Sequence, residues 1–152
     1  MTRRSLLALI PGALFFAARS SAQAPAPTIQ VLKDPSCGCC GVWVTHLQKA
    51  GFTVKVDESA DVTAAKNRLG VPAAARSCHT GTVGRYVLEG HVPAAEVKKL
   101  LATRPDVVGL AVPGMPIGSP GMEVASGLVQ PFDVLSFDKA GRTAVFARYG
   151  RS

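Results

Sequence analysis

The stretch DPSCGCCGVW, residues 34–43, holds Cys37, Cys39 and Cys40, three of the four cysteines in a chain of 152 residues. The residues before it alternate between polar and apolar side chains, which predicts a β-strand. The residues after it carry apolar side chains at helical spacing as far as Gly51, and glycine commonly ends a helix. The three cysteines therefore fall on the turn between a strand and the N-terminus of a helix.

Outward from this stretch, strand and helix patterns alternate along the chain. Strands are predicted at residues 28–34, 52–58 and 82–90 (the last a strand pair or one bent strand), helices at 39–51, 59–70 and 92–105, and a hairpin at 132–150. Residues 71–81 are predicted to form a loop or a single helical turn, and residues 106–131, rich in glycine and proline, a long loop. The predicted fold class is α/β (α+β), with a C-terminal β-hairpin and a long Gly/Pro-rich loop. Its first strand, cysteine-bearing turn and helix resemble the thioredoxin-like architecture.

Residues 1–24 have the anatomy of a secretory signal peptide, with a basic start, an apolar centre and a small-residue cleavage region. Cleavage is expected after Ala22 or Ala24. A retained anchor is the alternative, although the apolar run is shorter than the roughly 20 residues that cross a bilayer. The paired arginines also resemble a twin-arginine signal, so the export route stays open. Residues 28–150 are predicted to form one domain, exported to a bacterial periplasm, with no stable membrane span.

The net charge, the length and the number of cysteines exclude some classes of protein. Without residues 1–24, 14 basic and 10 acidic residues remain, so the net charge falls from +7 to +4. The basic residues are scattered, which excludes a nucleic-acid-binding stripe. A length of about 128 residues suits a single domain with an adequate core. Four clustered cysteines are too few for a disulfide scaffold at this size.

Clustered cysteines favour a metal site. Thiolate is the form of cysteine that binds metal, and a helix N-terminus stabilises it. Three sulfurs at Cys37, Cys39 and Cys40 repel one another as anions unless a cation lies among them, and Cys78 adds a fourth. Soft sulfur ligands prefer Cu(I), zinc or iron–sulfur clusters, and we expect several Cu(I) ions because the cysteine spacing typical of structural zinc is missing. The alternatives are an ordinary disulfide from Cys78 to Cys37 or Cys40, and a metal-free dithiol oxidoreductase.

Five further side chains are candidates for additional ligands or for contacts that orient the ligands: His46, His79, His91, Met115 and Met122. Imidazole is a common metal ligand, and thioethers either bind soft ions or fill gaps in packing. His46 is expected two helical turns beyond Cys39, which is too far for ligation. His91 lies at a strand-to-helix turn, where capping of the helix is the plain alternative.

Four longer segments carry a family resemblance: CGCCGVWVTHL, LGVPAAARSCHT, YVLEGHVPAAEVKKLL and GLAVPGMPIGSPGME. They resemble the CopG family of exported copper-resistance proteins, often described only as a domain of unknown function, over residues 29–149. The resemblance implies a thioredoxin-like fold and a copper–thiolate cluster held by the four cysteines. One departure from thioredoxins is that Pro72 precedes an alanine-rich turn, and not the strand that faces the site. This puts disulfide exchange on protein substrates in doubt.

The function predicted is that of a periplasmic copper-binding protein of copper resistance, which holds a Cu(I)–thiolate cluster. Interconversion of Cu(I) and Cu(II) is an activity that the resemblance implies, and it leaves open whether the protein is an enzyme. A metal-free thiol–disulfide oxidoreductase and a passive copper chaperone are the alternatives. Copper, with several ions per chain, is the expected cofactor, and the expected partners are copper efflux or redox proteins of the periplasm.

Overall fold

The structure is a computed structural model that describes residues 27–58 and 61–151. The predicted signal peptide lies outside these residues and stays a prediction. The elements are β1 (Ile29–Leu32), α1 (Gly38–Lys49), β2 (Val54–Asp57), α2 (Val62–Arg68), the 3₁₀ turn η1 (Ala73–Ala75), β3 (Thr80–Val83), β4 (Tyr86–Glu89), α3 (Ala94–Thr103), β5 (Gly109–Ala111), β6 (Phe132–Phe137) and β7 (Thr143–Tyr149). Each helix within the described ranges is too short or too polar to cross a membrane.

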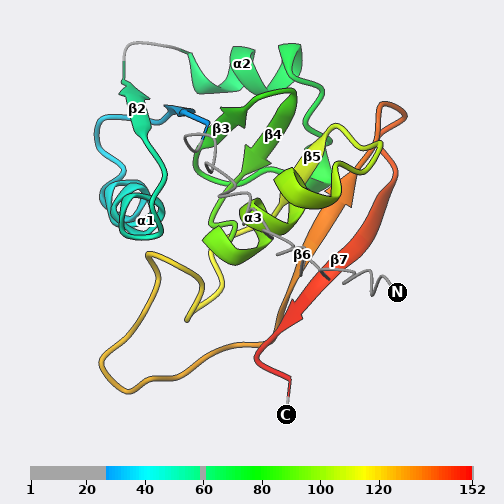
Figure 1. Cartoon of the computed structure of the whole chain (residues 1–152). Coiled ribbons are helices and arrows are strands. Elements are labelled where there is room, and N and C mark those ends of the chain that lie inside the picture. Colours follow the sequence, from blue (N-terminus) through cyan, green and yellow to red (C-terminus); the bar gives the residue numbers. More distant parts are fainter. Residues whose placement is uncertain (1–26, 59–60, 152) are drawn as a thin grey trace, which may run out of the picture.

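The described strands form one mixed sheet in the order β2-β1-β3-β4-β5-β6-β7 (Figure 1). β1 pairs with β2, and β4 with β5, in parallel, while the other neighbours are antiparallel. The parallel pairs are the ones connected through a helix, α1 or α3, because a parallel connection must return to the same end of the sheet. The predicted α/β class and the predicted C-terminal hairpin, now β6 and β7, are confirmed.

α1 is the helix that carries three of the cysteines. Its buried residues, Cys40, Trp43, Val44 and Leu47, recur at the spacing of a single helix face. Gly51 follows the helix with a φ of 94°, the left-handed conformation in which glycine ends helices at little steric cost. The hydrophobic pattern therefore fixes which side of α1 packs on the sheet, and with it the direction in which the first turn presents its sulfurs.

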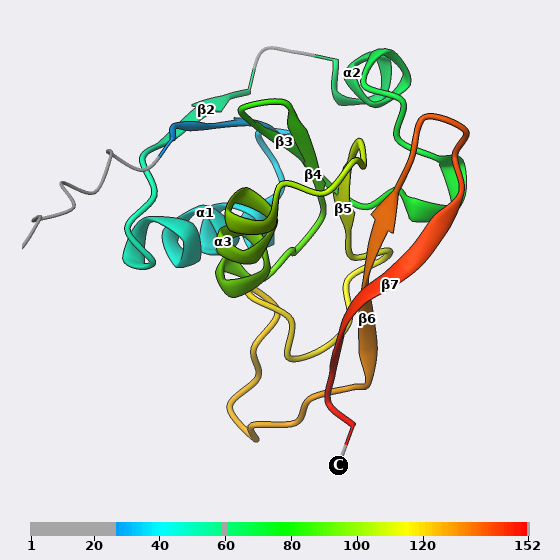
Figure 2. The same cartoon turned by 45° about the vertical axis from the view of Figure 1, so that its right-hand side comes forward.

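Successive side chains of the central strands point to opposite faces of the sheet, so each face has its own apolar core. Leu88 and Leu110 belong to the larger core, which also contains the buried residues of α3 and, apart from Cys40, those of α1. Their neighbours Val87 and Ala111 belong to a smaller core with Phe137, on the other face. Figure 2 shows α1 and α3 together on one side of the sheet and α2 on the other.

Two sequence-based expectations change in the structure. Residues 106–131, predicted as a continuous loop, contain the strand β5, and the residues on both sides of it are irregular. All three residues of β5 are buried, so they lack the polar–apolar alternation by which a strand is recognised. Residues 82–90, left open as a pair or a bent strand, contribute to a strand pair that turns at Gly84, where φ is 55°.

Candidate metal centre

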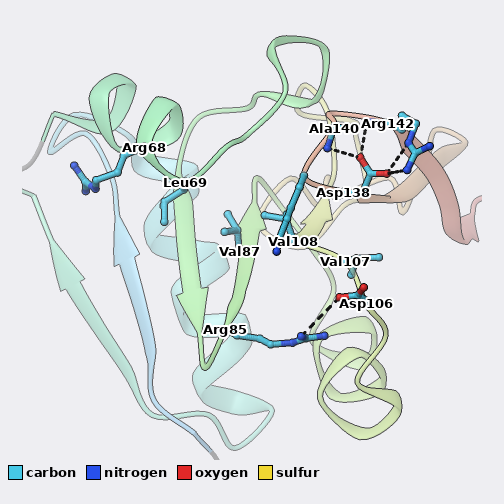
Figure 3. Close-up of a pocket in the computed structure, with 11 residues that line it drawn as sticks. Arg68, Leu69, Arg85, Val87, Asp106, Val107, Val108, Asp138, Ala140 and Arg142 are labelled. Atoms are coloured by element: carbon cyan, nitrogen blue, oxygen red, sulfur yellow. Dashed lines mark hydrogen bonds and ion pairs between the residues drawn. The ribbon is translucent and has the colours of Figure 1, made fainter.

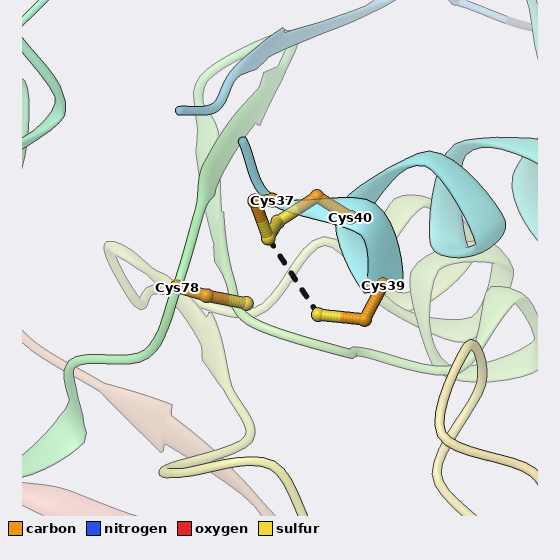
Figure 4. A group of neighbouring side chains, drawn as sticks. All are labelled: Cys37, Cys39, Cys40 and Cys78. Atoms are coloured by element: carbon orange, nitrogen blue, oxygen red, sulfur yellow. Dashed lines mark hydrogen bonds between the residues drawn. A yellow bond between two sulfur atoms is a disulfide. The ribbon is translucent and has the colours of Figure 1, made fainter. Parts of the chain in front are cut away.

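The four cysteines converge beside the N-terminus of α1 (Figure 4). Cys37 caps this helix, Cys39 and Cys40 lie in its first turn, and Cys78 comes from the loop before β3. Their sulfur atoms all lie within 4.8 Å of one another. The sulfurs of Cys37 and Cys39 are 3.5 Å apart. The fold therefore brings the one distant cysteine to the cluster of three.

Two of these sulfurs are joined in a disulfide, between Cys37 and Cys40, while Cys39 and Cys78 are free. The first turn of a helix brings residues three apart onto one side, and the two Cα atoms are 5.5 Å apart, within the usual range for a disulfide. The pairings of Cys78 with Cys37 or Cys40 considered from the sequence are therefore wrong. Cys37 and Cys40 also have the C-x-x-C spacing, which is the sequence signal for their pairing.

This disulfide also changes the argument from crowded anions. Two of the sulfurs carry no charge while they are bonded to each other, so a metal is not the only means of relieving their repulsion. Four thiolates meet only after the disulfide has gained two electrons and two protons and the resulting thiols have ionised. The structure shows the cluster as a disulfide with two free thiols, and two-electron reduction would convert it into four potential ligand sulfurs.

Two buried histidines face the Cys78 sulfur. His79 Nδ1 and His91 Nε2 each lie 3.2 Å from Cys78 Sγ, and the three residues form a second group of closely spaced metal ligands. His91 Nδ1 lies 2.7 Å from the carbonyl oxygen of Pro120, to which it donates its proton. This contact leaves the lone pair of Nε2 directed at the sulfur. His91 therefore does not cap a helix, the plain alternative for its position in the sequence.

His79 is held between an aromatic ring and the other imidazole. Its ring centroid lies 4.2 Å from that of Trp43 and 5.1 Å from that of His91. Its Nε2 atom is buried and has no hydrogen-bond partner among the described residues. A buried polar atom without a partner is costly, so it is a natural position for a further ligand or proton acceptor. Trp43 is a residue that the sequence analysis missed at this site.

Burial favours the uncharged forms of Cys78, His79 and His91 in the absence of metal. Burial, and then the neighbouring Cys39, raise the pKa of the Cys78 thiol to about 11. Burial, and then the positive fields of His91 and Lys66, lower the pKa of His79 to about 3. Burial also lowers the pKa of His91. A metal ion that binds here at neutral pH therefore meets neutral imidazoles and displaces the proton of a thiol.

The two methionines occupy different positions relative to the sulfurs. Met115 Sδ lies 3.9 Å from Cys39 Sγ, and the Met115 residue is 50% exposed, so its thioether covers the cluster from the solvent side. Met122 contributes through its backbone, which exchanges hydrogen bonds with Gly118 and Ser119 and closes a turn of the loop. The structure thus brings Met115 to the cysteines, whereas no hydrogen bond joins the Met122 side chain to them in the described part of the chain.

The loop between β5 and β6 packs tightly on the site at Gly121. A Cβ atom added there would lie 2.9 Å from the Cys39 carbonyl oxygen, 3.0 Å from the Trp43 nitrogen and 3.2 Å from His91 Nδ1. The φ of Gly121 is 90°, which other residues rarely adopt. Glycine is therefore required for the loop to approach α1 and for the preceding carbonyl of Pro120 to reach His91.

His46 lies outside the site. Its Nε2 accepts a hydrogen bond of 3.0 Å from the backbone N–H of Ala94, the first residue of α3. It therefore caps one helix from another and does not contact the sulfurs. The signal that could have indicated this role is the proline at position 93, because a helix that begins after proline has no side chain of its own to cap it.

One cavity reaches the metal centre, and a larger one is lined by other residues. One of about 390 Å³ reaches Cys78 and is also lined by Asp34, Asp61, Lys66 and Ser77, with Pro35, Val62 and Thr63. A larger one, of about 690 Å³, lies on the face of the smaller core, between the Arg85–Asp106 and Asp138–Arg142 pairs (Figure 3). Its lining contains no cysteine, histidine or methionine, so the larger cavity is not the metal centre.

Comparisons with known proteins agree with this architecture. The family described as "Protein of unknown function, DUF411" matches residues 75–122, a span that includes Cys78, His79 and His91. Two solved structures, named "Copper resistance protein copG- Form 1" and "Form 2", are each 46% identical in sequence, with a TM-score of 0.77. Each match covers 82% of this chain and 98% of the other. No curated protein matches. The chain therefore belongs to the CopG family of copper resistance proteins, as its sequence motifs predict.

Proposed function

We propose that this chain is an exported copper-binding protein of copper resistance, which holds a Cu(I)–thiolate cluster and interconverts Cu(I) and Cu(II). Copper is its cargo and substrate. Two observations support copper handling. The chain is similar to structures named copper resistance protein, and Cys78 belongs both to the group of four cysteines and to a group with two histidines. The single observation that carries the proposal is the convergence of four cysteine sulfurs, one of them from a distant loop, in a space less than 5 Å across.

The donor atoms fit copper better than the other common metals. Cys37, Cys39, Cys40 and Cys78 would supply bridging thiolates, and thiolate sulfur favours soft ions such as Cu(I). The Met115 thioether beside Cys39 adds a soft donor that zinc sites rarely use. Because thiolates can bridge, four of them can hold several Cu(I) ions. The short distances between the sulfurs support such a cluster.

The imidazoles extend the same site with nitrogen donors. His91 Nε2 already faces Cys78, and its other nitrogen is fixed by Pro120, the arrangement usual for a histidine that binds metal. His79 would add a second imidazole, whose Nδ1 also lies 3.2 Å from the same sulfur. Nitrogen donors suit Cu(II) as well as Cu(I), so this mixed set can accommodate both oxidation states. His46 and Met122 are not needed in this arrangement.

The disulfide provides an electron balance for copper interconversion. Reduction of the Cys37–Cys40 bond consumes two electrons and two protons and yields two thiols. Oxidation of two Cu(I) ions to Cu(II) releases two electrons, so the two half-reactions balance within one chain. The reverse direction reduces two Cu(II) ions at the expense of the dithiol. A redox partner in the periplasm would reset the pair, and a copper efflux protein would take the copper.

Anaerobic titration of the reduced protein with Cu(I), followed by elemental analysis, tests copper binding. We expect several coppers per chain, with short copper–copper and copper–sulfur distances in X-ray absorption. The Cys37→Ser and Cys78→Ser variants should bind fewer ions, whereas Ser126→Ala, in the exposed part of the loop, should match the wild type. The proposal is ruled out if the protein binds no copper, or if both cysteine variants bind as many copper ions as the wild type.

A metal-free thiol–disulfide oxidoreductase is the second candidate, and the Cys37–Cys40 disulfide at a helix N-terminus favours it. This function predicts reduction of insulin by the dithiol form without any metal, and inhibition by copper. Copper-dependent turnover with no activity on insulin supports the first proposal. Fast insulin reduction by metal-free protein supports the second.

A passive chaperone differs from both in that its copper never changes oxidation state. Oxidation of the copper-loaded protein by a mild one-electron oxidant separates the two cases. A redox protein should show Cu(II) signals in electron paramagnetic resonance while the metal stays bound. A chaperone specific for Cu(I) should release the metal on oxidation.

A further inference from the structure

A buried ion pair lies directly behind the segment that carries Cys78 and His79. Lys66, from α2, and Glu89, the last residue of β4, are joined at 2.5 Å, and their side chains are only 7% and 0% exposed. Lys66 Nζ also donates to the Thr80 hydroxyl at 2.8 Å. None of these groups is required by the ligand set, so their presence in the interior needs an explanation.

The Glu89 carboxylate holds both flanks of the Cys78–His79 dipeptide. One oxygen accepts the backbone N–H of Ser77 at 2.6 Å, and the other accepts the Thr80 hydroxyl at 2.6 Å. Ser77 directly precedes the dipeptide and Thr80 directly follows it. A single buried carboxylate therefore fixes the two ends of the segment, and with them the position of the Cys78 sulfur.

Two further contacts limit the same segment. The backbone N–H of Gly90 donates to the His79 carbonyl at 3.0 Å, and the Ser77 hydroxyl donates to the Gly114 carbonyl in the loop that carries Met115. A Cβ atom at Gly90 would lie only 2.6 Å from the Ser77 side chain. The ion pair is thus the innermost part of a network that leads to the sulfur cluster.

Stability alone does not account for such a pair. Removing two charges from water costs several kcal/mol per ion, and apolar residues of similar volume often stabilise a protein as well or better. A pair that is kept in the interior is better explained by the geometry that it imposes. In this protein the geometry in question is that of a cysteine and a histidine at the metal centre.

We propose that Glu89, held in place by Lys66, is a positioning residue that fixes Cys78 and His79 for metal binding. The role rests on the proposed copper function for its purpose, but the ordering of Cys78 can be measured without metal. Partners that orient metal ligands are commonly worth about 10- to 100-fold in metal affinity. We expect a loss of that size when the hydrogen bonds of the Glu89 carboxylate are removed.

The experiment compares two double variants that both remove the charges. Lys66→Met with Glu89→Leu removes the hydrogen bonds as well. Lys66→Met with Glu89→Gln keeps an amide that accepts from Ser77 N–H and pairs with the Thr80 hydroxyl. Glu96→Gln is the matched control, because Glu96 is a largely buried carboxylate on α3 that contacts Tyr149 and lies outside the network. Urea unfolding is measured for every variant.

Two readouts are taken, one with copper and one without. The first is the Cu(I) affinity of the reduced protein. The second is the rate at which iodoacetamide alkylates Cys78 in a Cys39→Ser background with the disulfide intact, where Cys78 is the one free thiol. We expect the leucine variant to fold, to lose about 10- to 100-fold in affinity and to be alkylated faster, and the glutamine variant to recover most of both.

The possible outcomes separate this role from the proposed function. If the wild type binds no copper, the copper function fails, and the alkylation rates still decide whether Glu89 orders Cys78. Equal affinity and equal alkylation rates in the wild type and the leucine variant overturn the positioning role. If the leucine variant does not fold, the glutamine variant decides. Wild-type affinity and alkylation in that variant support positioning by hydrogen bonds, and loss of both overturns it.

Discussion

Three sets of neighbours hold Cys78 in place, and the role of each can be tested by replacing single residues. Two imidazoles lie 3.2 Å from its sulfur, the Cys39 side chain approaches it, and the network behind it fixes its backbone. Because its thiol pKa is raised by burial, Cys78 is protonated until a metal replaces the proton. Its neighbours therefore determine what the sulfur can bind.

Replacing His91 by phenylalanine keeps a ring of similar size but removes the nitrogen directed at Cys78. We expect the Cu(I) affinity of the reduced protein to fall about 10-fold or more, in proportion to the loss of a ligand or ligand-orienting group. Competition with a coloured Cu(I) chelator measures this change. His46→Gln is the control, because His46 contacts Ala94 and not the sulfurs. Unchanged affinity in His91→Phe would show that His91 is only a packing residue.

Replacing Gly121 by alanine should disturb both stability and the site. The new Cβ would press on Cys39 and Trp43 at about 3 Å, in a backbone conformation with φ of 90°. We expect a loss of about 1–3 kcal/mol in the free energy of unfolding, with weaker copper binding. Gly127→Ala is the matched control, since Gly127 has a φ of 70° but open space around it. Equal losses in the two variants would mean that the loop does not pack on α1.

Among the helices, α1 and α3 are connected by His46, a residue of α1 whose side chain caps the N-terminus of α3. His46 Nε2 accepts the N–H of Ala94 only while that nitrogen carries no proton. Burial lowers the pKa of His46, so the folded protein resists its protonation. The contribution of the cap is therefore complete above the unfolded pKa of about 6.5, and it declines as the pH falls below that value.

We expect His46→Ala to lower the free energy of unfolding by about 0.5–2 kcal/mol at pH 8, the usual cost of removing a helix cap. This cost should shrink between pH 6.5 and pH 5, because the His46 of the unfolded wild type gains a proton that the folded protein resists, and this stabilises the unfolded state. Urea unfolding at a series of pH values checks the trend. Thr45→Ala, which removes an exposed hydrogen bond of the same helix, should cost the same at every pH. A cost for His46→Ala that does not vary with pH contradicts the cap.

At the scale of the whole molecule, the candidate ligands come from segments that are distant in the chain. They lie at the start of α1, before β3, after β4 and in the loop after β5. A copper cluster held by all of them would connect both halves of the sheet and the long loop. Binding should therefore stabilise the whole domain, since the unfolded chain cannot gather these ligands.

We expect Cu(I) at a hundredfold excess over its Kd to stabilise the reduced protein by about 2.7 kcal/mol. The thermal midpoint should rise by roughly 5–15 °C for a domain of this size. Anaerobic thermal unfolding followed by circular dichroism measures the shift. The Cys78→Ser variant should show a much smaller rise, because its cluster would no longer be tied to the strand β3. An equal rise in that variant would place the metal on α1 alone.

Residue patterns along the chain predicted the local features of this protein. The order of strands and helices followed from hydrophobic spacing, which each segment expresses without its neighbours, and Gly51 indicated where α1 ends. The cysteine cluster was visible because three of its members are close in the chain. The family resemblance extended the prediction to the four cysteines together, and the solved relatives at 46% identity confirm the family.

Which of these residues meet became evident from the three-dimensional packing of the chain. It paired Cys37 with Cys40, placed His91 at the sulfurs and His46 at another helix, and revealed Glu89 behind Cys78. It also inserted β5 where composition predicted loop. These outcomes depend on how helices rotate on the sheet and which strands become neighbours. That choice is made by burying apolar surface across the whole molecule, so no local pattern contains it.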